Sequence, residues 1–214
     1  MAWDTNNVNE WSNASLKIYL NGTYFDNLSE ISKLQIEDAK YYLGGKKWDD
    51  TTFYGSIEAI YTWERGTETC VTNGTCSGET KSTSWEGKVG LMYPSDMYMI
   101  YSQGVDIVCY NDPYNCSEYS SWGYHKATNI GYPTMGWIHN TNKLQNSDTQ
   151  KTTWLLNHNT DGSYGTFYAS FNGGMNTNNT TITVGVRPVV YLKSSIQITG
   201  GDGSEQHPYE LSGN

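Results

Sequence analysis

A polar segment in the last third of the chain lies between two runs of stiff apolar residues, and this pattern restricts the fold most. The segment follows Trp154-Leu155-Leu156 and ends at Val184-Gly185-Val186-Arg187-Pro188-Val189-Val190-Tyr191-Leu192. β-Branched and aromatic residues of this kind favour strands. The residues between the two runs are mainly Asn, Thr, Ser, Tyr and Gly. The pattern predicts strands that are anchored in a core and carry short polar side chains at the surface.

The same segment avoids long charged and amide side chains. Residues 152–186 contain no Lys, Glu or Gln, although the chain has 11 Lys, 11 Glu and 6 Gln. An even distribution would place about four or five of them in this window. Antibody binding sites use a similar mixture, because Tyr gives a large contact area at low entropic cost and Ser, Gly and Asn give adaptable hydrogen bonding. The composition therefore predicts a recognition surface.

A strand has a side-chain period of two residues, so alternate positions of the segment are expected to face solvent. The positions expected to face the core are Phe167, Ala169, Phe171, Ile182 and Val184. The positions expected to face out and contact a ligand are Asn157, His158, Asn159, Asp161, Ser163, Tyr164, Tyr168, Ser170, Asn172, Asn176, Asn178, Asn179 and Thr181.

Length and charge restrict the class of protein. A chain of 214 residues is long enough for one sizeable core, and no linker divides it, so we expect a single domain over residues 1–214. The net charge of −9 argues against nucleic acid as a partner, because binding to phosphates needs clustered Lys and Arg. The four histidines are scattered, and the chain lacks the glycine-rich and nucleophile motifs of common enzyme classes. The sequence therefore predicts no metal, no cofactor and no catalytic residue.

The four cysteines form two closely spaced pairs, Cys70 with Cys76 and Cys109 with Cys116. Each pair encloses a loop rich in turn-forming residues, which favours two local disulfides and an oxidising compartment. A zinc site with four thiolates is the alternative, although structural zinc sites usually have shorter spacings. The spacing leaves the connectivity open.

The order of the expected elements is helices, then irregular loops, then strands, which predicts an α+β fold. A first helix carries Leu16, Tyr19 and Leu20 on one face and ends at Asn21-Gly22. A second apolar face contains Leu28, Ile31 and Leu34, and a third helix begins near Ile57 and ends at Gly66. Strands are expected over residues 88–93, 166–171, 180–192 and 194–199, with a short helix over 97–101.

The closing part of the chain resembles a known family of surface proteins. Residues 185–192, followed by 198–203 and Pro208-Tyr209, are similar to a C-terminal signature of prepilin-like surface proteins of gut Firmicutes. The similarity continues upstream over residues 11–28, 61–66 and 85–96, and therefore spans most of the chain.

The strand that contains Gly185-Val186-Arg187 also resembles the closing strand of the C-type-lectin-like fold of formylglycine-generating-enzyme type. That fold is the scaffold of the variable proteins of diversity-generating retroelements, which randomise adenines of a template. A randomised AAC codon gives Asn, Thr, Ser, Tyr, His, Asp or Gly, among others, but never Lys, Glu, Gln, Met or Trp. Residues 155–174 contain none of these five residue types, and Met175 ends the interval. The resemblance thus implies a hypervariable surface at about residues 155–183.

The chain departs from the family in two respects. Neither cysteine pair matches the catalytic cysteines of the formylglycine-generating enzymes, and the calcium-binding motifs of lectins (Glu-Pro-Asn, Gln-Pro-Asp and Trp-Asn-Asp) are absent from the sequence. The resemblance therefore implies neither formylglycine chemistry nor calcium-dependent sugar binding.

Together these features predict an α+β, C-type-lectin-like binding domain of adhesin or receptor type at the bacterial cell surface. Its expected partner is a protein or glycan on another cell, a host or a phage, and it is not expected to be an enzyme. The chain opens on polar sequence without a signal peptide, so we expect that an N-terminal segment leading to a pilus or membrane anchor has been removed. Two alternatives remain open: a structural pilin-head subunit without a dedicated ligand, and an enzyme of formylglycine-generating type.

Overall fold

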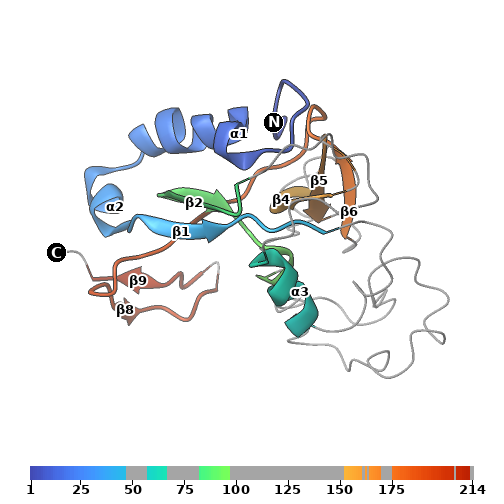
Figure 1. Cartoon of the computed structure of the whole chain (residues 1–214). Helices are drawn as coiled ribbons and strands as arrows, with labels where there is room; N and C mark the ends of the chain where they lie inside the picture. The colour runs from blue at the N-terminus through green and yellow to red at the C-terminus, as the bar shows by residue number, and fades with distance from the viewer. Residues whose placement is uncertain are drawn as a thin grey trace.

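The computed structural model describes residues 1–46, 57–66, 82–96, 152–160, 162, 164–169, 175–204 and 206–212. Within these ranges the chain forms a few short helices and small antiparallel sheets (Figure 1). The predicted α+β class is therefore confirmed. The single domain predicted over residues 1–214 stays a prediction, because much of the middle of the chain, including the predicted helix at 97–101, lies outside the described ranges.

The first helical region is longer than expected. It contains a 3-10 turn, η1 (Trp11–Asn13), then α1 (Ser15–Tyr19) and a π-helical turn, η2 (Leu20–Tyr24). The prediction that the helix ends at Asn21-Gly22 is wrong, because Asn21 does not act as a cap. Its side-chain nitrogen donates to the carbonyls of Lys17 and Val89, and its oxygen accepts from the backbone N–H groups of Lys88 and Val89.

Two further helices follow. In α2 (Glu30–Gln35), the hydroxyl oxygen of Ser29 accepts a hydrogen bond from the N–H of Ser32, as an N-cap does. The apolar face predicted here is not buried, since Ile31 is 65% exposed and Leu34 is 60% exposed. Helix α3 (Ile57–Glu64) is followed by Gly66, whose N–H donates to the carbonyl of Trp63. The predicted end of this helix is therefore confirmed.

The strands form four small antiparallel sheets. The first pairs β1 (Ala39–Tyr42) with β2 (Ser84–Gly87), and the second pairs β3 (Val89–Leu91) with β7 (Pro188–Val190). The third has the order β4 (Thr153–His158), β5 (Gly165–Ala169), β6 (Met175–Asn179). The fourth is the hairpin of β8 (Ile198–Gly200) with β9 (Glu210–Leu211).

The strand predicted over residues 180–192 is confirmed only at β7. Residues 180–184 instead bond to the beginning of the chain: the N–H of Trp3 donates to the carbonyl of Thr180, and the N–H of Val184 donates to the carbonyl of Met1. The strand predicted over 194–199 begins only at Ile198, after a turn closed by the N–H of Ile196 and the carbonyl of Lys193. Sequence periodicity did not reveal these pairings, because the partners are distant along the chain.

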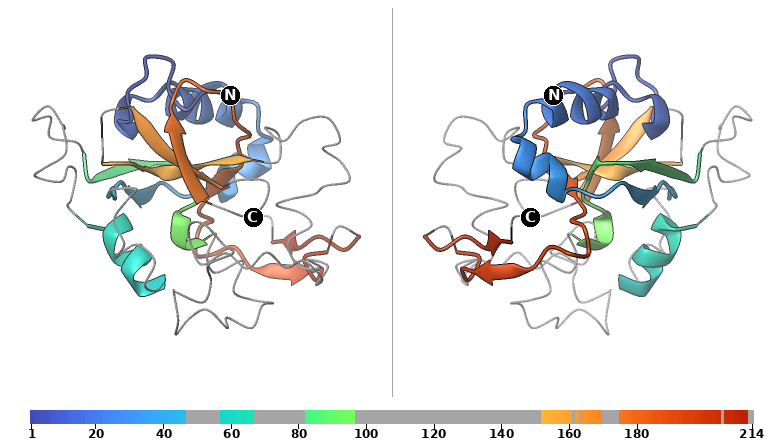
Figure 2. Two further views of the ribbon diagram at one scale, coloured as in Figure 1. Left: turned by 90° about the vertical axis from the view of Figure 1, so that its right-hand side faces the viewer. Right: turned by 90° about the vertical axis from the view of Figure 1, so that its left-hand side faces the viewer.

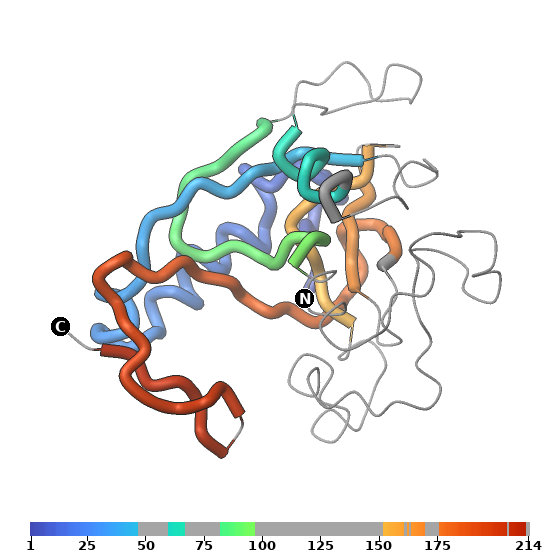
Figure 3. The backbone as a smooth tube through the Cα atoms, turned by 90° about the horizontal axis from the view of Figure 1, so that it is seen from below, coloured from blue at the N-terminus to red at the C-terminus, as the bar shows by residue number. Residues whose placement is uncertain are grey.

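The main core lies between the N-terminal helices and the sheets. Trp3, Trp11, Leu16 and Leu20 pack there with residues of β1, β3 and β4, among them Trp154. The N-terminal helices lie on one side of the strands and α3 lies on the other (Figure 2). On the α3 side, the ring of Trp63 contacts Phe167 of β5 at 5.6 Å between centroids. Strands β4 and β5 are thus covered on both faces, while the β8–β9 hairpin extends away from the sheets (Figure 3).

Candidate functional site

The structure corrects the predicted orientation of Asn157, His158 and Asn159. Their exposed fractions are 0%, 4% and 8%, so none of the three faces solvent. The reason is a neighbouring segment that follows β1. Asn157 donates from its side-chain nitrogen to the carbonyl of Gly44 at 2.7 Å, and the N–H of Lys46 donates to the carbonyl of His158. These three residues anchor the end of β4 and are excluded from the candidate site.

Five of the predicted ligand-contacting residues are exposed and lie close together. Tyr164 is 51% exposed, and the other four lie on β6 or just after it. The N–H of Thr180 donates to the carbonyl of Tyr164, which joins the end of β6 to the start of β5. We call this group the β6 polar surface: Tyr164, Asn176, Asn178, Asn179 and Thr181.

The remaining predictions for this segment have mixed outcomes. Tyr168 is only half-buried, and its ring packs edge-on against Trp154 at 6.1 Å, so it belongs to the margin of the core. Phe167, Ala169 and Val184 are buried as predicted. Ile182 is half-buried. The predictions for Asp161, Ser163, Ser170, Phe171 and Asn172 lie outside the described residues.

The turn between β4 and β5 is held by Asn9, which is 1% exposed. Its side-chain nitrogen donates to the carbonyls of Asn159 and Gly162 at 3.0 Å and of Gly165 at 2.6 Å. One buried amide from the start of the chain therefore fixes the turn that precedes Tyr164. Sequence reasoning missed this residue, because nothing near Asn9 indicates a partner about 150 positions away.

Strand β6 is the outer strand of its sheet in the described part of the chain, and its register on β5 is regular. Asn176 lies opposite Tyr168, Thr177 opposite Phe167, and Asn178 opposite Thr166. Phe167 is 0% exposed, whereas Asn176, Asn178 and Asn179 are exposed. A polar outer strand is thus supported by a neighbour that is fixed in the core. This arrangement allows the outer side chains to change at little cost to the fold, because exposed substitutions usually change stability by less than about 0.5 kcal/mol.

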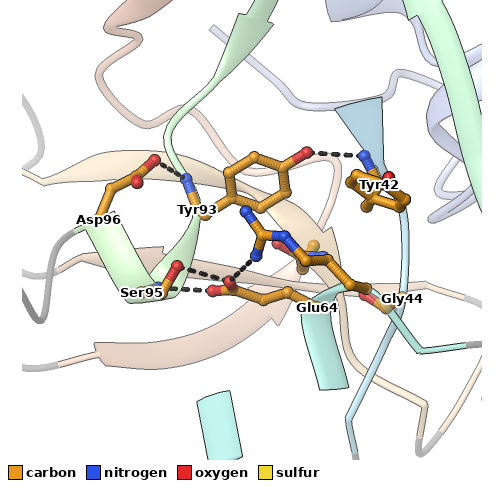
Figure 4. A network of polar contacts seen from close by, with 8 residues as sticks. Tyr42, Gly44, Glu64, Tyr93, Ser95 and Asp96 are labelled. Atoms are coloured by element: carbon orange, nitrogen blue, oxygen red, sulfur yellow. Dashed lines mark hydrogen bonds and ion pairs between the residues drawn. The ribbon is translucent and has the colours of Figure 1, made fainter. Parts of the chain in front are cut away.

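A second cluster of polar groups surrounds Glu64 at the end of α3 (Figure 4). Its carboxyl group is fully buried and accepts hydrogen bonds from the N–H and hydroxyl of Ser95, at 2.5 and 2.6 Å, and from Arg65 at 3.1 Å. The backbone carbonyl of Glu64 accepts from the N–H of Gly44. The serine hydroxyl donates to the carboxyl group. The cluster therefore joins α3 to the helical residues 94–96, which follow β3, and to the segment after β1.

Tyrosine rings enclose the guanidinium group of Arg65. Its central carbon lies 3.4 Å from the ring centroid of Tyr61, 5.0 Å from that of Tyr93 and 5.6 Å from that of Tyr42. The hydroxyl of Tyr93 accepts a hydrogen bond from the N–H of Tyr42 (Figure 4). Cation–π contacts of this kind hold a partly desolvated cation in place. Arg65 is thus already bound by the protein's own rings.

Burial raises the pKa of Glu64 from 4.5 to about 7, against the opposing effects of the Ser95 donors and the Arg65 charge. A carboxyl group with a raised pKa is protonated more readily in the folded than in the unfolded chain. The contribution of this carboxyl group to the free energy of unfolding is therefore fully present below pH 4.5, where the group is protonated in both states, and is lost as the pH rises through 7.

The two cysteine pairs lie outside the described residues, so the predicted disulfides, the zinc alternative and the enzyme alternative stay predictions. In the described ranges, no three His, Cys, Asp or Glu side chains gather as metal ligands would. No helix in the same ranges has the length and apolar character needed to cross a membrane.

Comparisons with protein-family models, with curated proteins and with solved structures found no match for this chain.

Proposed function

We propose that this chain is an extracellular ligand-binding domain of adhesin or receptor type whose contact residues form the β6 polar surface. One observation carries the proposal: within the described ranges, Tyr164 and the exposed asparagines lie on or beside the outer strand of a sheet whose next strand, β5, is mostly buried. Tyr and Asn are the side chains that binding sites use for contact area and adaptable hydrogen bonds. A fixed inner strand with a polar outer strand supports recognition by side chains that can vary.

The proposal includes the C-type-lectin-like fold of formylglycine-generating-enzyme type and display on a bacterial surface through a pilus or membrane anchor. The sequence similarities of residues 185–203 and of the upstream segments support it. The absence of Lys, Glu, Gln, Met and Trp from residues 155–174 supports diversification by a retroelement. Diversification predicts that the neighbouring DNA carries a near-copy of this coding segment, differing only at adenines, beside a reverse transcriptase.

Mutation of the whole surface at once tests the binding function. The purified chain is applied to glycan arrays and to arrays of bacterial and host surface proteins, and the variant is applied to the same arrays. The variant carries five substitutions: Tyr164→Ser, Asn176→Ser, Asn178→Ser, Asn179→Ser and Thr181→Ala. We expect the wild-type chain to bind one class of array member and the variant to lose this binding with a melting temperature within a few degrees of wild type.

A matched control places similar substitutions on the exposed β8–β9 region: Tyr209→Ser, Gln197→Ser and Ser195→Ala. This control variant is expected to bind as the wild type does. Binding that survives the five substitutions would contradict the proposal, and so would a five-residue variant that does not fold.

A further inference from the structure

The hydrogen-bond pattern of β6 shows which of its backbone groups face away from the sheet. In an antiparallel pair, every second residue exchanges hydrogen bonds with its opposite, and the residues between direct theirs outward. The N–H of Thr180 donates to the carbonyl of Tyr164, and the same register continues through Asn178 opposite Thr166. Thr180 and Asn178 are thus the residues that exchange hydrogen bonds with β5. The residues before each of them, Asn179 and Thr177, direct their groups outward, so the N–H and carbonyl of Thr177 and the N–H of Asn179 point to the outer edge.

Both outward N–H groups are covered by the preceding side chain. The side-chain oxygen of Asn176 accepts from the N–H of Thr177 at 2.8 Å, and that of Asn178 accepts from the N–H of Asn179 at 2.8 Å. Both asparagines are exposed in the described part of the chain, so each oxygen can leave its N–H by rotation of the side chain. The outer edge of β6 is thus closed by two removable side-chain contacts.

Outer strands are usually protected from pairing by Lys, Pro, a bulge or very short length. Residues 175–179, with the sequence Met-Asn-Thr-Asn-Asn, contain neither Lys nor Pro. Their register on β5 is uninterrupted. No charged residue occurs in residues 162–186, so no charge opposes an approaching backbone from this segment. The side chains of Asn176 and Asn178 are therefore the feature of this strand that protects its outer edge from pairing with another strand.

We propose that the outer edge of β6 binds an extended segment of a partner polypeptide by strand addition. The partner's carbonyls replace the oxygens of Asn176 and Asn178 on the N–H groups of Thr177 and Asn179, and one partner N–H donates to the carbonyl of Thr177. An extended chain presents these groups at the same two-residue interval as β6, whereas sugar hydroxyls have no such fixed repeat. This inference rests on the proposed function and assigns its ligand to the polypeptides.

Peptides selected from a random phage-displayed library against the full chain provide the probe. Each selected peptide is resynthesised with a single N-methyl group at successive positions, and its affinity is measured by fluorescence anisotropy. Strand addition predicts that a methyl group on the N–H that meets Thr177 weakens binding at least about tenfold, since it removes a hydrogen bond and leaves a carbonyl without it. Methyl groups on the two adjacent positions point away from β6 and should be tolerated.

Two changes to the protein test the same contact. Thr177→Pro removes an N–H that faces away from β5, a position where an outer strand tolerates proline, and should weaken peptide binding at least about tenfold. Thr177→Val keeps this N–H and serves as the matched variant. Should Thr177→Pro fail to fold, the N-methyl series decides the question.

Four results would overturn the inference: failure to select any peptide, uniform tolerance of N-methylation, unchanged binding to a folded Thr177→Pro variant, or a wild-type dimer in sedimentation that Thr177→Pro converts to a monomer. The proposed function fails separately. A glycan or folded protein that loses binding with the five-residue variant, but binds Thr177→Pro normally, would refute strand addition and support the β6 polar surface as the binding site.

Discussion

Replacement of Asn9 by alanine tests how the candidate site is held in place. The side-chain nitrogen of Asn9 donates to three main-chain carbonyls of the β4–β5 turn, and the residue is buried. The nitrogen carries two hydrogens for three carbonyls, so one hydrogen is shared between two of them and the contacts are equivalent to about two hydrogen bonds. A net hydrogen bond contributes about 0.5–1.5 kcal/mol, and a buried polar group deprived of its partner costs more. We expect Asn9→Ala to lower the free energy of unfolding by about 2–4 kcal/mol.

Asn9→Asp refines this test, because aspartate has nearly the same shape but presents only oxygen atoms to the carbonyls. At neutral pH its charge is buried against carbonyl oxygens, so it should destabilise the fold more than alanine does. Urea denaturation followed by tryptophan fluorescence gives both values. Hydrogen exchange at the backbone N–H of Asn159, which donates to the carbonyl of Gly165, reports on the turn itself and should become faster in both variants.

The matched control is Asn21→Ala. This residue is also an asparagine with several main-chain partners, but it joins the first helical region to β3. It should lower stability without a selective effect on exchange at Asn159. A free energy of unfolding of Asn9→Ala within about 0.5 kcal/mol of the wild-type value, as for ordinary surface substitutions, would show that Asn9 does not hold the turn. Unchanged hydrogen exchange at Asn159 would show the same.

Three further predictions concern the interior. Glu64→Gln should remove a pH dependence of stability, because burial raises the pKa of Glu64 to about 7. Between pH 4.5 and 8, the wild-type free energy of unfolding, measured by urea denaturation, should fall by about 3 kcal/mol relative to that of the variant. An equal pH dependence in the two proteins would contradict this. Gly44→Ala should destabilise by about 2–3 kcal/mol, because the added carbon would overlap the main-chain carbonyls of Trp63 and Glu64; an unchanged melting temperature would refute the close approach. Phe167→Ala should cost about 3–5 kcal/mol, since the ring is fully buried beside Trp63, and denaturation would show a smaller loss if β5 were exposed.

Local sequence patterns predicted those parts of the structure that depend on local interactions. The α+β class, the end of α3 at Gly66 and the burial of Phe167 and Ala169 follow from turn residues and from a two-residue alternation. The exposure of Tyr164, Asn176 and Asn178 fits the same alternation, whereas Asn179, directly after Asn178, is exposed at the end of β6. These features need no knowledge of distant partners, because an outer strand exposes its polar positions wherever it lies.

The errors arise where a residue far along the chain supplies the partner. Asn157 was expected outside because it is polar, but the carbonyl of Gly44 satisfies its side chain inside the protein. Asn21 was interpreted as a helix end, since Asn-Gly usually ends helices, yet β3 supplies partners that let the helix continue. Asn9 gave no signal at all. In each case an amide side chain, buried at Asn9 and Asn157 and half-buried at Asn21, bonds to main-chain groups that a sequence pattern cannot locate.

The pairing of the first residues with the last third of the chain has a consequence during synthesis. Trp3 donates from its ring nitrogen to the carbonyl of Leu155 and from its backbone to the carbonyl of Thr180. At about 5–20 residues per second, a ribosome needs roughly 8 to 35 s to progress from Trp3 to the region of Leu155 and Thr180. Throughout that interval Trp3 lacks these two partners, although Trp11 and Leu16, which it also contacts, are already made. A chaperone that holds apolar nascent segments would therefore act on this region until the ribosome has passed residue 180.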